Sequence, residues 1–457
     1  MAVIDYIKSK LFSGHERSVK AKKNILALAG LKGYSVAVSL ALIPLTLKLL
    51  DEYQYGVWIT LFNVLSWISI FDIGIGNGLR NKFAEAMAKN RIEEARDYVS
   101  TAYFLMFGIS ISLILIFIIP WILVDWSKVF NVPSEFGNDI FFLVGITFLL
   151  TSFQFSLTLI GTLLTANHKP GWSALMGTIS NTLVLLLFWF GKDMVNGSLF
   201  TVGFIYTGVP LLVFLLSSLY LFSNQFKSVS PKMSFFRKSK VKSLFSLGMQ
   251  FFIIQIAVVV IFSTDSMIIT HMLSPKEVTP YSIVFRYFSV VTMAAGIIMT
   301  PLWSAYTEAA AKGDLQWIRN ILKKQLILFS FLVVVVFILY KFGQPLIKLW
   351  LKNDIVISNH LFMGMALYTI LSLWNNIFSF FLGGLSLVRL GTFLTTITAL
   401  LNIPLSIYFI KVFDNDVGGV IYATSVCIGI TAIVSPIQTW YFLYAKTKTD
   451  LLTKILR

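Results

Sequence analysis

The chain contains a long series of apolar segments, each close to the length that an α-helix needs to cross a membrane. A spanning helix requires about 20 apolar residues. Inside lipid, the backbone polar groups of each segment must be satisfied by its own hydrogen bonds. Twelve such segments can be placed, at residues 24–49, 54–76, 98–123, 139–166, 173–191, 198–222, 243–270, 279–304, 322–341, 357–383, 391–412 and 418–444. The sequence therefore predicts an all-α, polytopic integral membrane protein with about twelve transmembrane helices.

One pattern occurs twice along the chain. An apolar hairpin at 24–76 is followed by a polar amphipathic stretch at 84–90, and a second hairpin begins at 247 and is followed by a similar stretch at 307–313. The ungapped offset between the copies is 223 residues in a chain of 457. A duplicated membrane bundle is typical of transporters whose solute path lies between two halves. We therefore expect two six-helix lobes related as parallel repeats.

The expected domain boundaries follow from this duplication. They are a cytoplasmic leader at 1–23, an N-terminal lobe at 24–222, a basic linker at 223–242, a C-terminal lobe at 243–444 and a cytoplasmic tail at 445–457.

Basic residues are distributed unevenly between the two sides of the predicted membrane. With the N-terminus inside, 27 of the 37 Lys and Arg residues fall in cytoplasmic segments, 8 in external segments and 2 within spans. This asymmetry obeys the positive-inside rule and predicts that both termini are cytoplasmic. The net charge of +16 is then explained by topology and by attraction to anionic lipid headgroups, and nucleic acid is not an expected partner.

The sequence lacks the residues that several classes of function require. The single cysteine, Cys427, excludes an intrachain disulfide. No cluster of His, Cys and carboxylates predicts a metal site, and no phosphate-binding loop predicts ATP hydrolysis. The external loops are also too short for a catalytic domain. We expect neither an enzyme nor a bound cofactor.

Four charged residues stand inside the predicted spans, where each is costly and by default functional. Lys32 and Asp72 each lie 20 residues from the turn near residue 52, and Asp265 and Arg286 lie 10 and 11 residues from the turn near residue 275. Each pair thus places one base and one acid at equal depth on neighbouring antiparallel helices. We expect ion pairs, or a role of Asp72 and Asp265 in coupling transport to an ion; Lys32 and Asp72, near the cytoplasmic mouth, could instead extend to the membrane interface.

Polar residues accompany these charges on the same helix faces. The 223-residue offset aligns Lys32 with Gln255 and Asn63 with Arg286. Arg286 also shares a face with Ser282 and Ser289, and Lys32 with Ser35 and Ser39. Small polar stripes can instead be helix-packing seams. The residues predicted to bind substrate are Lys32, Arg286, Asn63, Gln255, Ser35 and Ser289.

One stretch resembles a known family. The segment 71–82, FDIGIGNGLRNK, preceded by Tyr55-Gly56-Val57-Trp58, is similar to bacterial O-antigen and polysaccharide-unit flippases, which share a superfamily with multidrug extruders. The resemblance is specific over about 25–100 and elsewhere concerns only the layout. It implies a central cavity lined by spans 1, 2, 7 and 8 in an inner-membrane protein. The implied cargo is an oligosaccharide on undecaprenyl pyrophosphate, with a polysaccharide polymerase and a chain-length regulator as possible partners.

Two other functions stay open at this point. A multidrug exporter of the same superfamily would favour acids over bases in its cavity. A polytopic glycosyltransferase or polymerase would need a larger external loop.

Overall fold

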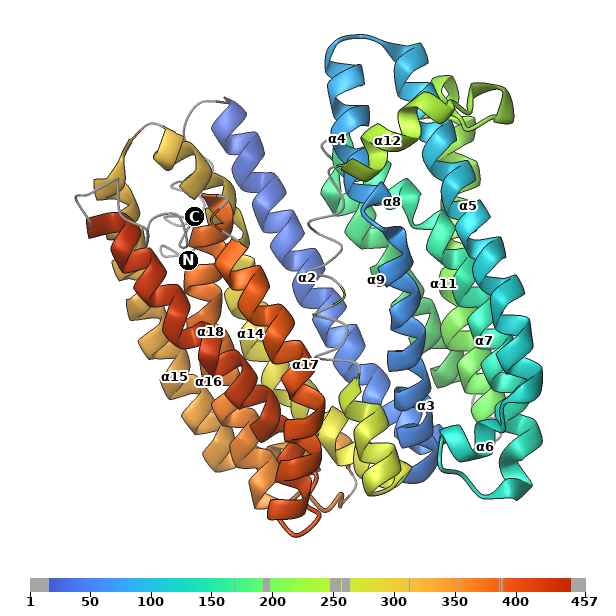
Figure 1. The fold of residues 1–457 in the computed structure, drawn as a ribbon, viewed down its shortest axis with the longest axis vertical. Coiled ribbons are helices and arrows are strands. Elements are labelled where there is room, and N and C mark those ends of the chain that lie inside the picture. Colours follow the sequence, from blue (N-terminus) through green and yellow to red (C-terminus); the bar gives the residue numbers. More distant parts are fainter. Residues whose placement is uncertain are drawn as a thin grey trace, which may run out of the picture.

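The structure is a computed structural model that describes residues 16–167, 169–191, 198–246, 256, 264–311, 313–352, 354–385, 387 and 389–444. In these residues the chain is built of helices joined by short connections. Figure 1 shows two bundles of helices side by side, with the N-terminal half in blue to green and the C-terminal half in yellow to red. We call these bundles the N lobe and the C lobe.

The N lobe is formed by helices that run up and down through the bundle. They are α2 (Glu16–Leu49), α3 (Glu52–Leu65), η1 (Ser66–Asp72), α4 (Ile75–Ala88), α5 (Ile92–Leu123), α6 (Trp126–Val129), η2 (Ser134–Phe136), α7 (Gly137–Leu157), α8 (Leu159–Ala166), α9 (Pro170–Phe190) and α11 (Leu199–Ser223). Within this lobe α11 and α5 pack against α7, and α2 packs against α9.

The linker and the C lobe follow. Their helices are η3 (Lys227–Val229), η4 (Met233–Phe235), α12 (Lys238–Ser246), α14 (Pro275–Ala311), α15 (Leu315–Leu351), α16 (Asn359–Gly384), α17 (Arg389–Val412) and α18 (Gly418–Tyr444), and residues 264–272 are also helical. In the C lobe α18 packs against α16 and α17, and α16 packs against α14.

Within the part of the chain that the structure describes, eleven helices are long and apolar enough to cross a membrane. They coincide with eleven of the twelve predicted spans, so the all-α, multi-pass fold class is confirmed. The remaining predicted span, 243–270, lies mostly outside the described residues. The repeat relation between the lobes and the domain boundaries stay predictions.

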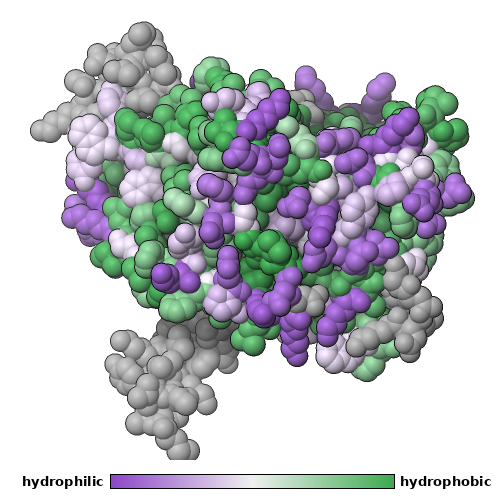
Figure 2. Space-filling model, turned by 90° about the horizontal axis from the view of Figure 1, so that it is seen from below, coloured by the Kyte–Doolittle hydropathy of each residue, from purple (hydrophilic) through white to green (hydrophobic). Residues whose placement is uncertain are grey.

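The surface has the polarity expected of a membrane protein. Large apolar side chains are exposed along the middle of helices in both lobes, among them Ile116 of α5, Leu216 of α11 and Leu400 of α17, which are 67%, 63% and 71% exposed. Figure 2, a view from below Figure 1, shows hydrophilic residues gathered across the end of the molecule. Exposed apolar sides with polar ends are favourable when the sides contact lipid.

The second predicted span is interrupted, which differs from the prediction. It was expected to run continuously through 54–76, but α3 ends at Leu65 and a 3₁₀ segment leads to a turn at Ile73 and Gly74. Both turn residues are left-handed, with φ of 46° and 78°. Glycine adopts such a conformation at little cost, which explains its use at 74. The counterpart in the C lobe, α14, is continuous, so the two hairpins differ here.

The basic linker is folded against the N lobe. Lys240 forms an ion pair of 2.7 Å with Glu94, and Arg237 lies 3.6 Å from Asp97. The α12 helix packs against α4 and α5. Part of the linker's positive charge is therefore neutralised by acids at the start of α5.

Candidate functional site

A cavity of about 700 Å³ lies between the lobes. Spans 1, 2 and 8 and residues 264–272 of span 7 contribute to its wall, as the resemblance implied. The α7, α9 and α11 helices also line it, which was not expected. The volume is in the range of pockets that enclose a drug-sized ligand.

One end of this cavity is closed by contacts between the lobes. We call it the hairpin end, because α2 joins α3 there and residues 264–272 join α14; it is the lower end in Figure 1. The opposite end, where α4 and α12 lie, is called the linker end. Every hydrogen bond between described residues that joins the two lobes lies towards the hairpin end.

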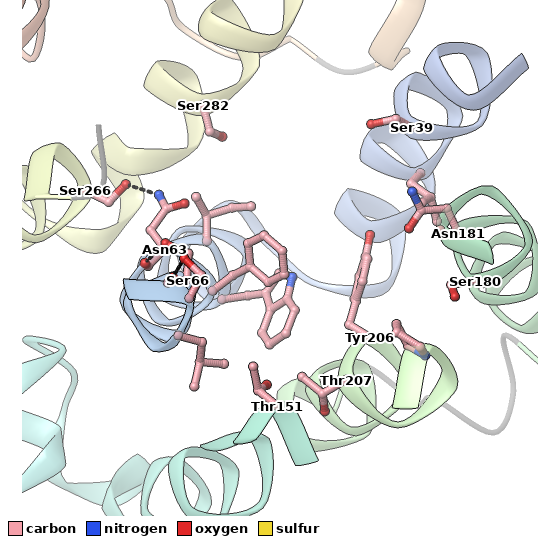
Figure 3. Close-up of a pocket in the computed structure, with 18 of the residues that line it drawn as sticks. Ser39, Asn63, Ser66, Thr151, Ser180, Asn181, Tyr206, Thr207, Ser266 and Ser282 are labelled. Carbon is pink, nitrogen blue, oxygen red and sulfur yellow. Dashed lines mark hydrogen bonds between the residues drawn. The ribbon is translucent and has the colours of Figure 1, made fainter. Parts of the chain in front are cut away.

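The contacts at the hairpin end form a series along α3. The Thr279 hydroxyl donates to the Glu52 carbonyl at 2.5 Å, and the hydroxyls of Thr60 and Thr270 are 3.0 Å apart. Deeper in, the Asn63 amide donates to the Ser266 hydroxyl at 2.6 Å, as Figure 3 shows. We refer to these three hydrogen bonds as the interlobe clamp.

Gly56 explains how the lobes approach so closely. A Cβ atom at this position would lie 1.8 Å from the carbonyl oxygen of Pro275, at the start of α14. Only a residue without a side chain permits this backbone contact.

Asp265 is not paired with Arg286, so the predicted ion pair is wrong. Asp265 is 2% exposed, and its Oδ2 accepts a hydrogen bond of 2.5 Å from the Tyr281 hydroxyl. The other carboxylate oxygen has no hydrogen-bond partner. The reason is that equal depth fixes height but not rotation about the helix axis, and Tyr281 rather than Arg286 is turned towards the acid.

Arg286 lies on the cavity wall instead. It is half-buried, and it forms no ion pair or hydrogen bond through its side chain with a described residue. Arg286 and Asp265 are the charged residues among the described residues of the cavity wall, and both belong to the C lobe. The cavity therefore offers one guanidinium group to a ligand.

The predicted pairing of Lys32 with Asp72 is also wrong. Asp72 accepts a hydrogen bond of 2.8 Å from the backbone N–H of Gly76 and so stabilises the first turn of α4. Because the chain turns at 73–74, the carboxylate is directed to the new helix terminus, where an acid is favourable. Lys32 is exposed on α2.

The other predicted site residues are divided between the wall and its surroundings. Asn63 lines the cavity, as do Ser39 and Ser282 from the predicted polar faces. Ser35 and Ser289 are half-buried and lie outside the lining, and the Ser289 hydroxyl donates to the Arg286 carbonyl. Gln255 lies outside the described residues.

The polar residues that α7, α9 and α11 contribute to the cavity were not predicted. Gln154 and Thr151 of α7, Asn181 of α9 and Tyr206 of α11 all line the cavity (Figure 3 labels all but Gln154). Carboxamides inside apolar spans were the available signal, but these helices carry no charged residue on the cavity wall and lie outside the duplicated hairpins. Among the described residues no group of three potential metal ligands occurs.

The fold and the cavity define a class, a multi-pass membrane protein with a polar cavity between two helical lobes. The comparisons with known proteins specify the family. The family model described as polysaccharide biosynthesis protein matches residues 21–307, more than half of the chain, so the chain belongs to that family. A second model, described as MatE, matches residues 251–408.

Relatives and solved structures agree with this assignment. Proteins named provisionally as O-antigen transporters match from Salmonella typhimurium, at 24% identity over 80% of this chain and 84% of the relative, and from Salmonella typhi, at 22% over 86% and 90%. A structure described as the inward-facing conformation of a multidrug resistance MATE family transporter has a TM-score of 0.75 at 12% identity, covering 93% of this chain and all of that one. An outward-facing conformation described in the same terms has a TM-score of 0.65 at 14% identity, covering 93% and 96%. These likenesses show the fold.

Proposed function

We propose that this protein is a flippase that moves oligosaccharide units linked to undecaprenyl pyrophosphate from the cytoplasmic to the periplasmic leaflet. The membership in the polysaccharide biosynthesis family and the names of the relatives support this cargo. The proposal places the protein in the bacterial inner membrane with both termini in the cytoplasm. It makes a polysaccharide polymerase and a chain-length regulator candidate partners in the same membrane.

The observation that carries the proposal is the position of Arg286. A guanidinium group within a membrane span is expensive unless it is paired or hydrated. Arg286 faces the cavity, and no described acid is paired with it. A diphosphate supplies the missing negative charge, and arginine can bind phosphate oxygens through two parallel hydrogen bonds.

Lys32 extends the path towards the linker end. It is exposed on α2, seven residues before Ser39 of the cavity wall, which is about 10 Å along a helix. In the proposed function Lys32 attracts the pyrophosphate at the entrance, and Arg286 receives it inside.

The interlobe clamp fits a cavity that alternates between the two sides. It closes the hairpin end, which the positive-inside rule assigns to the periplasm. We infer that this structure represents the state that receives cargo from the cytoplasm, and that the two lobes rock to release it. A role of Asp265 in coupling transport to an ion is part of this proposal. It is supported by the carboxylate oxygen of Asp265 that is buried beside the cavity without a hydrogen-bond partner.

The alternative, a drug exporter, receives less support from the cavity. A site for lipophilic cations would favour uncompensated acids, whereas the described lining holds one arginine and one acid that is bonded to Tyr281.

The test measures polysaccharide display at the surface of a strain that lacks its own flippase. Arg286→Ala should abolish display, and Arg286→Lys should reduce it about tenfold, since lysine keeps the charge but loses the bidentate geometry. Lys32→Arg should be tolerated. Membrane levels of each variant serve as the control. Full display from Arg286→Ala at a normal protein level would refute the proposed role.

A further inference from the structure

The cavity has two chemically different walls. Its charged described residues, Arg286 and Asp265, both come from the C lobe. The N-lobe wall carries polar side chains that are all uncharged, together with aromatic rings. A cargo with a charged part and a neutral polar part would therefore be bound in one orientation.

Two carboxamides on the N-lobe wall have unused hydrogen-bonding capacity. Gln154 of α7 and Asn181 of α9 are half-buried, line the cavity and form no side-chain hydrogen bond with a described residue. Three other carboxamides inside the spans donate hydrogen bonds, whereas Asn375 Oδ1 of α16 also lacks a partner but does not line the cavity. Asn63 donates to Ser266, Asn402 to Thr424 at 3.0 Å and Gln438 to the Leu387 carbonyl at 3.2 Å.

The surroundings of these amides complete a site for a polar, uncharged ligand. Ser39 of α2 and Thr151 of α7 also line the cavity without a hydrogen bond from their hydroxyls to a described residue. Figure 3 shows Asn181 on the side of the cavity where Ser39 and Tyr206 lie. Phe62, which is 49% exposed, adds an aromatic face to the same wall.

Sugar rings match this combination. Each ring carries several hydroxyls that both donate and accept hydrogen bonds, and a carboxamide offers two donors and one acceptor side by side. The C–H face of a sugar is apolar and can lie on an exposed aromatic ring. A sugar acid would bring a negative charge to a wall that has no described cation to pair with it, and desolvating that charge would be costly.

We propose that Gln154 and Asn181 determine which sugars the protein accepts, and that the sugars held at this wall are uncharged. The inference rests on the proposed function. Arg286 binds the diphosphate from the C-lobe side, while the two amides form hydrogen bonds with the sugar from the N-lobe side. A ligand group that leaves buried amides unpaired is rejected strongly, which is the physical basis of such selectivity.

The experiment measures binding affinity directly and separates the contribution of the diphosphate from that of the sugar. Purified protein in nanodiscs is titrated with undecaprenyl diphosphate, and with the same lipid carrying one residue of glucose, galactose, N-acetylglucosamine, N-acetylgalactosamine or glucuronic acid. At least one neutral sugar should improve affinity about tenfold over the sugarless lipid, and glucuronic acid should not.

The variants assign that gain to residues. Gln154→Ala and Asn181→Ala should each lower the sugar-dependent gain about threefold and leave binding of the sugarless lipid unchanged. Gln154→Asn and Asn181→Gln should retain part of the gain, because the amide is preserved. Asn224→Ala, at an exposed carboxamide outside the cavity, is the matched control.

The outcomes distinguish the inference from the function on which it rests. A sugar-dependent gain that survives in Gln154→Ala/Asn181→Ala, or the absence of a gain for every neutral sugar, overturns the inference. Binding of the sugarless lipid that is unaffected by Arg286→Ala overturns the proposed diphosphate site instead.

Discussion

At the scale of single residues, the two charged positions of the C-lobe wall are used differently. Asp265 is buried and bonded to Tyr281, whereas Arg286 faces the cavity. The sequence could place both residues at the same depth, because depth follows from counting along a helix. It could not fix which neighbour each side chain meets, because that depends on the rotation of two helices about their axes.

The bond between Tyr281 and Asp265 should be important for stability. Tyr281→Phe removes the hydrogen bond to the buried Asp265 side chain, and a buried polar group left without its partner costs about 1–3 kcal/mol. We expect a lower thermal unfolding temperature of the detergent-purified protein, with a smaller decrease in Asp265→Asn, because the asparagine oxygen can still accept the hydrogen bond from Tyr281.

A comparison with Arg286 checks this assignment. Arg286→Gln should leave the unfolding temperature nearly unchanged, because Arg286 pairs with no described acid. If Arg286→Gln destabilised the protein as much as Tyr281→Phe does, Asp265 would depend on the arginine after all.

At the scale of elements, the interlobe clamp joins α3 of the N lobe to α14 and residues 264–272 of the C lobe. The hydroxyls of Thr60 and Thr270 are close enough that cysteines there could form a disulfide. In Thr60→Cys/Thr270→Cys, oxidation should stop polysaccharide display, and reduction should restore it. Transport that continues with the disulfide formed would show that the lobes do not separate here.

A matched pair within one lobe controls for the disulfide itself. The hydroxyls of Ser110 on α5 and Ser156 on α7 are 2.6 Å apart inside the N lobe. Oxidised Ser110→Cys/Ser156→Cys should transport normally, since this bond does not join the lobes.

The backbone contact at Gly56 gives a second prediction for the same elements. Gly56→Ala would place a methyl group against the Pro275 carbonyl, so the clamp should weaken and the hairpin end should open. A cysteine introduced at Ser282 on the cavity wall should then react faster with a membrane-impermeant maleimide added from outside. Gly208→Ala is the control, because its nearest neighbour would lie 3.9 Å away. Equal reactivity in both variants would contradict this role of Gly56.

The elements also show which parts of the fold could be predicted. Span positions follow from hydrophobicity, and eleven were confirmed. The end of α3 at Leu65 and the turn at Ile73 and Gly74 were not predicted, because the apolar pattern continues through both. The contribution of α7, α9 and α11 to the cavity depends on how spans are arranged around the N lobe, which a single sequence does not contain.

At the scale of the whole molecule, the basic residues and the closed end of the cavity lie at opposite ends of the axis that runs from the linker end to the hairpin end. The linker end carries α12 and its lysines, and the hairpin end carries the interlobe clamp. If the linker end is cytoplasmic, the cavity is closed towards the periplasm, and anionic cargo meets Lys32 before Arg286. The reverse orientation would require the basic linker to be translocated, against the positive-inside rule.

This orientation can be measured with single cysteines at exposed positions in a background in which the native Cys427 is replaced. Glu135→Cys lies in the loop before α7 at the hairpin end, and Lys238→Cys lies at the start of α12 at the linker end. An impermeant maleimide should label 135 in intact cells and should reach 238 only after the membrane is permeabilised. The two sites are both exposed in the protein, so a difference in labelling reports the membrane and not local burial. Labelling of 238 in intact cells would show that the protein has the opposite orientation in the membrane. The interlobe clamp would then close the cavity on the side from which the lipid-linked sugars must enter.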